Sequence, residues 1–160
     1  MPHITLRPAV PADAALIHHF ITELAVYERA EREVVASVAD IELTLFGPDA
    51  VAHAVVCCID EEPAGYAVYF FSYSTWLGKP GLYLEDLYVS PARRGSGAGK
   101  ALLKHLAQVA CQRGCGRFEW SVLDWNEPAI RFYEALGAAP QSEWVRYRMA
   151  GEPLARLAQG

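Results

Sequence analysis

The fold of this chain is decided by the stretch Val89-Ser90-Pro91-Ala92-Arg93-Arg94-Gly95-Ser96-Gly97-Ala98-Gly99-Lys100. It follows an apolar run, Leu82 to Val89, that is typical of a strand, and it opens a strongly periodic run, Ala101 to Arg113, that is typical of a helix. Three alternate glycines allow a ligand to approach the backbone closely, and a helix N-terminus presents unpaired N–H groups with partial positive charge. With two neighbouring arginines, these features predict a site for phosphate or pyrophosphate.

The spacing of these residues excludes two common phosphate loops. A P-loop requires Gly-x-x-x-x-Gly-Lys-Ser/Thr, but Arg94 stands at the first glycine position and Ala101 has no hydroxyl for magnesium. A dinucleotide fingerprint requires glycines at i, i+2 and i+5, and counting from either Gly95 or Gly97 leaves no glycine at the last position. A glycine-rich turn without a ligand would be costly, because glycines weaken a helix start unless a close neighbour requires them.

The pattern Arg94-x-x-Gly97-x-Gly99 resembles the Arg/Gln-x-x-Gly-x-Gly/Ala signature of the GCN5-related N-acetyltransferases. In that family the loop amides hold the pyrophosphate of acetyl-CoA. The resemblance implies acetyl-CoA as the cosubstrate, used without a metal ion. The cofactor-binding residues that it implies are Leu87, Tyr88, Val89, Arg94, Gly95, Ser96, Gly97, Ala98, Gly99, Lys100, Asn126 and Tyr133.

The composition places the chain among globular proteins. Its 160 residues, 52% of them apolar, predict a single domain over residues 1–160, which the resemblance implies is an N-acetyltransferase domain. The net charge of −5 argues against nucleic acid as a partner, and no apolar run reaches the roughly 18–20 residues of a membrane span. Met1-Pro2-His3-Ile4 is not a basic-then-apolar leader, which predicts a cytoplasmic location without membrane contact. The four cysteines are expected to remain thiols.

Periodicity and turn residues predict an α/β fold with a mixed, largely antiparallel sheet flanked by helices. This layout matches the acetyltransferase fold along nearly the whole chain. Strands are expected at residues 4–7, 51–59, 64–73, 82–89, 118–123 and 144–149, with the turn between the second and third at residues 60–63. Helices are expected from residue 11, after the Ser37-x-x-Asp40 capping signal as far as Gly47, at 101–113 and 128–136, and as a turn at 154–158.

Two adjacent carboxylates stand in the middle of the strand-like run Leu82 to Val89. Glu85 and Asp86 would point to opposite faces of a regular strand, unless a bulge intervenes. An alkyl amine has a pKa near 10.4, so it arrives protonated at neutral pH and cannot attack a thioester. A carboxylate attracts this cation and accepts its proton, directly or through water. The other interpretation is an exposed sheet face that carries surface acids.

A second candidate segment runs from Asp124 to Gly137. Asn126 precedes Glu127-Pro128 as an ordinary helix N-cap would. The segment also resembles the Asn-x-x-Ala/Ser-x-x-Phe-Tyr-x-x-x-Gly pattern of the same acetyltransferases. That resemblance implies that Asn126 contacts the pantetheine arm and that Tyr133 lies beside the acetyl-CoA sulfur. A phenol with a pKa near 10 is a suitable general acid for the departing thiolate.

Longer segments resemble the spermidine/spermine (diamine) acetyltransferase branch, which includes relatives acting on thialysine. The similarity extends from Ile4 to about Met149 and includes Glu23 to Glu28 and Phe71 to Lys79. It implies that Glu85 is the base and Tyr133 the acid, and that the enzyme is a homodimer paired through its C-terminal strands. The residues implied for the channel of a small cationic amine are Tyr27, Glu28, Glu85, Asp86, Glu143 and Trp144.

Three functional hypotheses follow from the sequence. The first is direct acetyl transfer from acetyl-CoA to a primary amine of a small di- or polyamine, such as putrescine, spermidine or spermine. The second is acetyl transfer to thialysine, an aminoglycoside, a protein lysine or another lysine-like amine, because the chain departs from the polyamine enzymes around Arg29 to Glu33 and Ser142 to Arg146. The third is a non-catalytic acetyl-CoA-binding module, which would need the glycine loop but not Glu85 and Tyr133.

Overall fold

The computed structural model describes residues 2–160, which form two compact units, 2–121 and Val122–Gly160. The first unit contains a five-stranded sheet in the order β1-β2-β3-β4-β5. Neighbours among the first four strands are antiparallel, and β5 joins β4 in parallel, which confirms the predicted mixed, largely antiparallel sheet. The strands are β1 (Ile4–Pro8), β2 (His53–Ile59), β3 (Glu62–Ser74), β4 (Lys79–Val89) and β5 (Arg117–Trp120).

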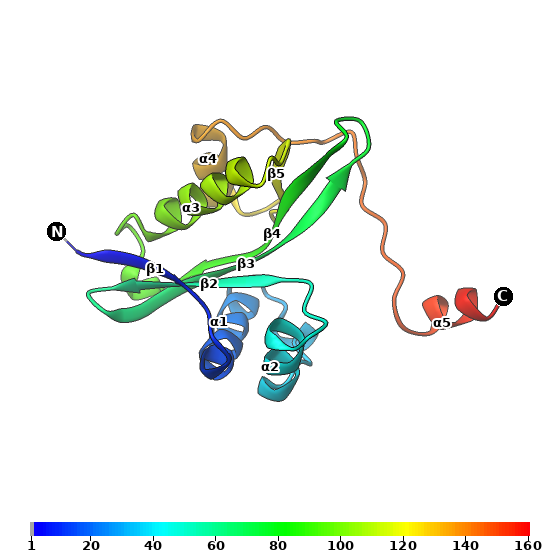
Figure 1. Cartoon of the computed structure of the whole chain (residues 1–160), viewed down its shortest axis with the longest axis horizontal. Coiled ribbons are helices and arrows are strands. Elements are labelled where there is room, and N and C mark those ends of the chain that lie inside the picture. The colour runs from blue at the N-terminus through cyan, green and yellow to red at the C-terminus, as the bar shows by residue number, and fades with distance from the viewer. Residues whose placement is uncertain (1) are drawn as a thin grey trace. The chain divides into compact units, whose positions relative to one another are not determined.

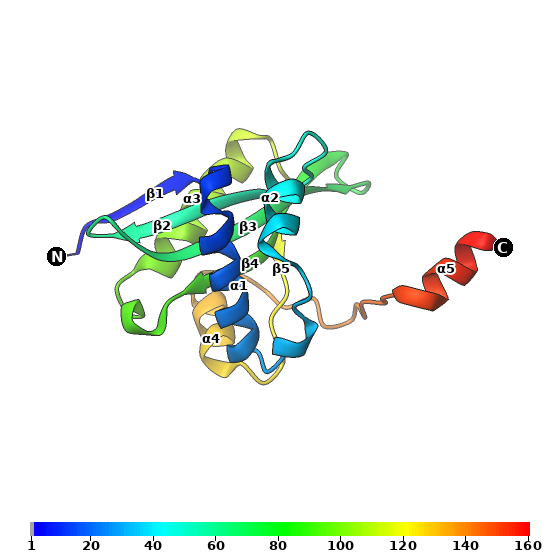
Figure 2. The same cartoon turned by 90° about the horizontal axis from the view of Figure 1, so that it is seen from below.

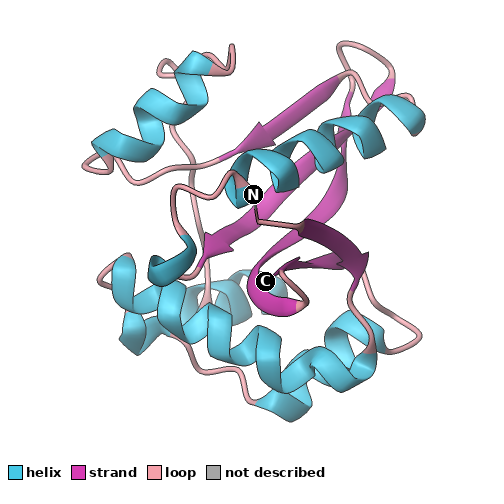
Figure 3. Cartoon of the chain, turned by 90° about the vertical axis from the view of Figure 1, so that its left-hand side faces the viewer, coloured by secondary structure: helices cyan, strands magenta, loops and turns pink. Residues whose placement is uncertain are grey.

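Helices cover both faces of this sheet, as Figures 1 and 3 show. α1 (Ala14–Tyr27) and α2 (Val38–Phe46) lie side by side on one face (Figure 2), and α3 (Ala98–Gln112) lies on the other. Short 3-10 turns at Pro11–Asp13, Glu31–Glu33 and Pro91–Arg93 precede or follow these helices. The predicted capping signal is confirmed at α2: Asp40 N donates to Ser37 Oγ at 3.0 Å, and Ser37 N donates to Asp40 Oδ2 at 2.9 Å.

The core has one apolar layer on each face of the sheet. On the α1 face, Ile17 and Phe20 pack with Tyr66 and Tyr88, a directly opposed pair on β3 and β4. Phe20 stacks on Tyr66 at a ring-centroid distance of 5.5 Å and lies tilted against Tyr88 at 5.9 Å. On the other face, α3 packs on β3 and β4 and buries its leucines 102, 103 and 106. Two tyrosine hydroxyls therefore lie within an apolar layer, where each needs a hydrogen-bond partner.

The β2–β3 turn is tighter than the sequence predicts. Only Asp60 and Glu61 connect the strands, with φ angles of 51° and 71°, and Pro63 pairs with Cys58 inside β3. Positive φ at both central residues matches the twist of a two-residue hairpin. Proline is accommodated because the register shifts next to it, between Cys57 and Cys58. The four-residue turn predicted at 60–63 is therefore wrong by two residues.

The second unit contains two helices, α4 (Glu127–Ala135) and α5 (Gly151–Gln159). The final strand predicted at 144–149 is wrong: these residues form no strand in the described chain, 2–160, because β-forming side chains do not provide the hydrogen-bonded neighbour that a strand needs. The single turn expected at 154–158 is instead a full helix, α5. No helix among residues 2–160 is long and apolar enough to cross a membrane.

Candidate active site

The glycine loop has the conformation that its sequence indicates. β4 ends at Val89, and α3 begins after Gly97, its N-cap, which has a φ of 91°. Gly95 has a φ of 78°, also in the region that side chains disfavour. Gly99 is different, because its backbone is helical and a Cβ atom there would meet no other atom within 4 Å. Neither strain nor internal packing explains a glycine at this position, whereas an approaching ligand does.

The first turn of α3 completes a cradle for an anion. The first N–H groups of a helix have no intrahelical partner, and here they follow two glycines with left-handed backbone. The Ala98 amide donates to Ser96 Oγ at 3.3 Å, which fixes the loop just before the helix. Lys100 is exposed in the first turn. Helix-start amides, open space at Gly99 and a basic residue in the first turn are the features that a pyrophosphate site requires.

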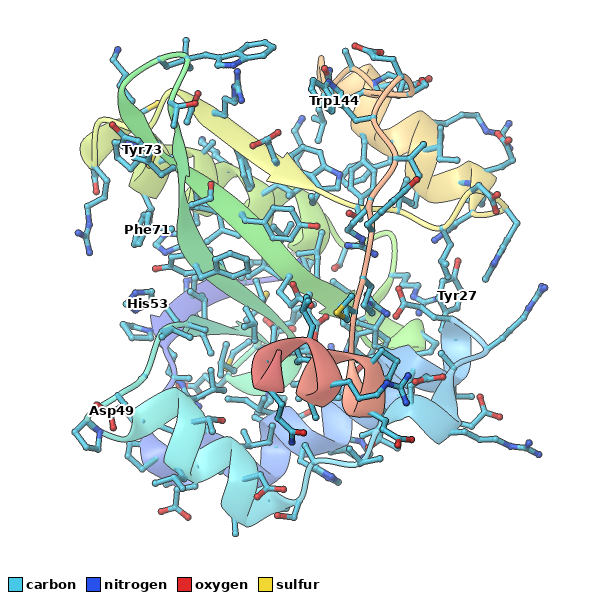
Figure 4. All side chains as sticks on the ribbon, turned by 90° about the vertical axis from the view of Figure 1, so that its right-hand side faces the viewer. Tyr27, Asp49, His53, Phe71, Tyr73 and Trp144 are labelled. Atoms are coloured by element: carbon cyan, nitrogen blue, oxygen red, sulfur yellow. The ribbon has the colours of Figure 1, made fainter. Side chains whose placement is uncertain are left out.

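The two arginines before the loop point to other parts of the first unit. Arg93 forms an ion pair with Glu62 at 3.1 Å on β3. Arg94 donates from Nε to the Val89 carbonyl oxygen at 3.2 Å, and its Cζ lies 4.9 Å from the centroid of the Tyr27 ring. Tyr27 is the last residue of α1 and is labelled in Figure 4. The Arg94 side chain therefore contacts α1 in this structure.

β4 has an unpaired edge beside the loop. β5 pairs with β4 only from Gly81 to Leu84, opposite Arg117 to Trp120. Beyond Leu84, residues 86–89 of β4 pair on the β3 side alone within the described part of the first unit, 2–121. Backbone groups along that edge are thus available to a ligand. This edge includes Leu87, Tyr88 and Val89, the strand residues predicted to bind the cofactor.

A β-bulge at Glu85 explains how two adjacent carboxylates reach one side of the sheet. Asp86 pairs with Val68 and Leu84 pairs with Tyr69, so Glu85 has no opposing residue in β3. An extra residue of this kind breaks the alternation of faces. Burial raises the pKa of the Glu28 carboxyl, and the charges of Asp86 and then Glu85 raise it further. Glu28, at the C-cap of α1, therefore lies near enough to Glu85 and Asp86 of β4 to feel their charges, and we call these three carboxylates the acid cluster.

Asp86 is the most buried member of the acid cluster. The Tyr66 hydroxyl donates to its Oδ2 at 2.6 Å. Burial raises the pKa of Asp86, and the hydrogen bond from Tyr66 opposes that rise by stabilising the charged form. The pKa of Tyr66 lies well above its ordinary value, first because of burial and then because of the Asp86 charge. The cluster therefore concentrates negative charge in a partly desolvated place, which suits the binding of a cation.

The sequence predictions missed Tyr66 as part of this site. It lies within the apolar run 64–73, where it could be read only as a core residue of a strand. The one signal available was its hydroxyl, since a buried tyrosine usually finds a hydrogen-bond partner. The sequence does not identify that partner, because Asp86 lies twenty residues further along the chain.

The second unit carries the remaining predicted site residues. Asn126 is at the N-cap of α4, but its side chain makes no capping hydrogen bond. Tyr133 is half-buried in α4, with its ring tilted against Phe132 at 5.7 Å. Glu143 and Trp144 lie in the exposed segment after α4, where Trp144, labelled in Figure 4, is 67% exposed. Thus Glu28, Glu85 and Asp86 come together in the first unit, and Asn126 and Tyr133 share one short helix in the second.

Comparison with known proteins identifies the class that this fold and loop define. Residues 16–138 match the sequence model of the Acetyltransferase (GNAT) family, and the chain belongs to that family. It is 37% identical over 169 residues to the thialysine N-epsilon-acetyltransferase of Sus scrofa, covering 99% of both chains. It is 31% identical to the human spermidine/spermine N(1)-acetyltransferase-like protein 1, a match that covers 99% of this chain and 24% of that protein.

A solved structure supports the fold over the same range. An integron cassette protein from the mobile metagenome of V. cholerae superposes with a TM-score of 0.82 at 25% identity, covering 98% of each chain. The predicted fold class and the resemblance to the spermidine/spermine-like branch are therefore confirmed. The protein is an acetyl-CoA-dependent amine N-acetyltransferase.

Proposed function

We propose that this acetyltransferase acts on a terminal primary amine of a small molecule that carries a second ammonium group, as di- and polyamines do. The acid cluster of Glu28, Glu85 and Asp86 is the observation that carries this proposal. It lies just after α1 and on β4, the two elements that Arg94 of the cofactor loop contacts through Tyr27 and Val89. A dication gains more than a monoamine from several carboxylates, because one ammonium stays bound while the other loses its proton.

Glu85 has the position of a general base in this proposal. It is exposed at the bulge, where an incoming ammonium and water have access. The acceptor nitrogen gives its proton to Glu85, directly or through one water, and the free amine then attacks the thioester carbonyl. Glu28 and Asp86 attract the cation and hold its second charge. Tyr27, the last residue of α1, precedes Glu28 and lines the acceptor site with it in this proposal.

The cofactor side of the mechanism uses mainly backbone groups. The amides from Gly95 to Lys100 hold the pyrophosphate, and an N–H near Leu87 or Tyr88 stabilises the developing oxyanion. In the same proposal Asn126 contacts the pantetheine arm, and Tyr133 gives the departing thiolate a proton. As the C–S bond breaks and the amide forms, the nitrogen gives its second proton to water, from which Tyr133 regains its own proton, so the products are the acetamide and the free thiol. No step requires a redox change.

A lysine-like acceptor is the second candidate, favoured by the similarity to thialysine acetyltransferases over the whole chain. Thialysine also has a terminal amine and a second ammonium, but it adds a carboxylate that the acid cluster would repel. Glu143 and Trp144, predicted to bind the acceptor, lie in a segment where the chain departs from the polyamine enzymes. The two candidate acceptors therefore differ in whether the site accepts or rejects the carboxylate of a lysine-like molecule.

The experiment is thiol release from acetyl-CoA across matched acceptors, with mass spectrometry of each product. The panel is putrescine, spermidine, thialysine, lysine and n-butylamine, the last as a monoamine of putrescine's length. We expect kcat/KM for a diamine to exceed that of the monoamine at least tenfold. Equal values would refute the role of the acid cluster, and a wide advantage for thialysine would select the second candidate. Acetyl-CoA binding without any product would select the non-catalytic module.

We also propose that residues 1–160 act as one acetyltransferase domain and that the enzyme is a homodimer. The family match, 16–138, spans both units. Trp144, Val145, Tyr147 and Met149 are all more than half exposed, which is unusual for an alternating apolar segment unless a partner covers it. A monomer in light scattering at micromolar concentration would refute the dimer. The cytoplasmic location stays a prediction.

A further inference from the structure

The Arg94 side chain has a second role that its place in the glycine loop does not predict. Its Nε donates to the Val89 carbonyl oxygen at 3.2 Å, so the side chain turns back along β4. Its Cζ lies 4.9 Å from the centroid of the Tyr27 ring and 5.9 Å from that of the Tyr88 ring. A guanidinium at these distances from an aromatic ring is attracted by the ring's quadrupole. Arg94 thus bridges the cofactor loop, β4 and α1.

The two rings beside Arg94 differ in their surroundings, and only Tyr88 is buried. Tyr88 is 4% exposed, packs against Phe20 and donates its hydroxyl to Glu23 Oε2 at 3.0 Å. Glu23 also receives His19 Nε2 at 2.7 Å on its other oxygen. Tyr27 follows Glu23 by four residues, so both side chains lie on one face of α1. The loop arginine therefore lies against one buried, hydrogen-bonded ring, Tyr88, and one partly exposed ring, Tyr27, at the end of α1.

This contact connects the two halves of the proposed site. Tyr27 is adjacent in sequence to Glu28 of the acid cluster, whereas Arg94 opens the loop that receives pyrophosphate. We infer that Tyr27 is a positioning residue for the cofactor loop: its ring holds Arg94, so the acceptor-side end of α1 sets the affinity for acetyl-CoA. The inference rests on the proposed function, in which the glycine loop binds that cosubstrate.

The inference differs from a role in which Arg94 only contributes charge to phosphate. In that case lysine would replace Arg94 with modest loss, and a residue of α1 would be irrelevant to cofactor affinity. Under the inference lysine fails, because an ammonium offers neither the planar group that stacks on Tyr27 nor the Nε donor to Val89. Truncation of the Tyr27 ring then has the same effect as loss of the guanidinium.

The test is the dissociation constant of acetyl-CoA, measured by calorimetry on the full chain without any acceptor. Tyr27→Phe keeps the ring and should bind within about twofold of wild type, whereas Tyr27→Leu should bind about three- to tenfold more weakly. Tyr27 is 39% exposed, so both variants should fold, and thermal melting checks this. Tyr27→Leu binding like wild type, or Tyr27→Phe binding as weakly as Tyr27→Leu, would overturn the inference.

A double-mutant cycle separates the contact from a general effect on α1. If Tyr27 acts through Arg94, Tyr27→Leu combined with Arg94→Lys should bind acetyl-CoA about as weakly as Arg94→Lys alone. Additive losses would mean that the two side chains act independently, which also overturns the inference. Failure of the proposed function looks different, because wild type itself would then show no acetyl-CoA binding or no acetyl transfer.

Discussion

The cofactor loop and the acid cluster are neighbours on β4, yet they are built in opposite ways. The loop is made of backbone: glycines with positive φ, open space at Gly99 and the free amides of a helix start. The acid cluster is made of side chains from two elements, brought together by a bulge at Glu85 and supported by the Tyr66 hydroxyl. The first kind of site tolerates few added atoms, and the second tolerates few changes of charge.

The two regions also differ in what they cost the folded protein. Each glycine at the helix start loses more conformational entropy on folding than another residue would, so the destabilisation is distributed over several residues. The acid cluster costs electrostatic free energy, because burial raises the pKa of both Glu28 and Asp86, and neighbouring negative charges raise that of Glu28 further. Substitutions should therefore distinguish the two regions. A change that stabilises the loop should weaken the binding of acetyl-CoA, and a change that stabilises the acid cluster should weaken the binding of the acceptor amine.

Glu85→Gln should give the largest loss on the acid side. Glutamine keeps the size of the side chain but accepts no proton, so kcat/KM should fall about 10²- to 10⁴-fold. The loss should be most severe at low pH, where the acceptor ammonium is hardest to deprotonate, and smaller as the pH approaches the amine pKa. Initial rates over a pH series test this, with Glu42→Gln on α2 as an exposed control. A loss independent of pH would contradict a base at Glu85.

Tyr133→Phe should cause a comparable loss in kcat, about 10²- to 10⁴-fold, if the phenol protonates the thiolate. The change keeps the ring that packs against Phe132, so folding and acetyl-CoA affinity should be nearly intact. The high-pH limb of the rate profile should change in this variant, which distinguishes its role from that of Glu85. Full activity would remove tyrosine from the mechanism and leave solvent as the proton donor.

Gly99→Ala should have opposite effects on stability and on cofactor binding. A Cβ there meets no atom of the protein within 4 Å and the backbone is already helical, so alanine should stabilise α3 by ~0.5–1 kcal/mol. The same methyl group would occupy space that the cosubstrate needs, and the dissociation constant of acetyl-CoA should rise about tenfold. Melting curves and calorimetry test both effects. Unchanged affinity would mean that the ligand does not approach Gly99.

The cofactor loop was predictable from sequence because its determinants are local. The order of strand, glycines and helix specifies the backbone shape of the loop, and the capping box at Ser37 and Asp40 is local in the same way. Element boundaries were less predictable where pairing decides them: β5 stops at Trp120 because its partner β4 reaches the bulge after Leu84. The segment 144–149 has a strand-like pattern but no strand neighbour within residues 2–160.

The acid cluster was only half predictable. Glu85 and Asp86 could be identified as candidates from the sequence. That both side chains reach the same side of the sheet depends on a bulge, which no residue type in β4 predicts. The supports of the site were not predictable at all, because Tyr66 reaches Asp86 and Tyr27 reaches Arg94 across distances in sequence of twenty residues or more. The register of β3 against β4 brings Tyr66 to Asp86, and the packing of α1 against the sheet brings Tyr27 to Arg94.

Asp86→Asn should give the smallest effect and the clearest measure of what the acid cluster costs. Asparagine can accept the hydrogen bond from Tyr66 but carries no charge, so the acceptor KM should rise several-fold while acetyl-CoA affinity stays unchanged. Because burial raises the pKa of Asp86 above its ordinary value of 3.8, the carboxyl favours folding most when it is protonated, and this contribution is lost as the pH rises through its pKa in the folded state. The asparagine variant should therefore melt higher than wild type at pH 7, by about 2–4 °C for each kcal/mol relieved, and the advantage should shrink near pH 4.

Tyr66→Phe is the matched control, since it leaves Asp86 charged without its donor and should lower the melting temperature at pH 7. If the asparagine variant melted lower than wild type at pH 7, Asp86 would be a stabilising carboxylate, and the acid cluster would not be the strained region that separates it from the loop.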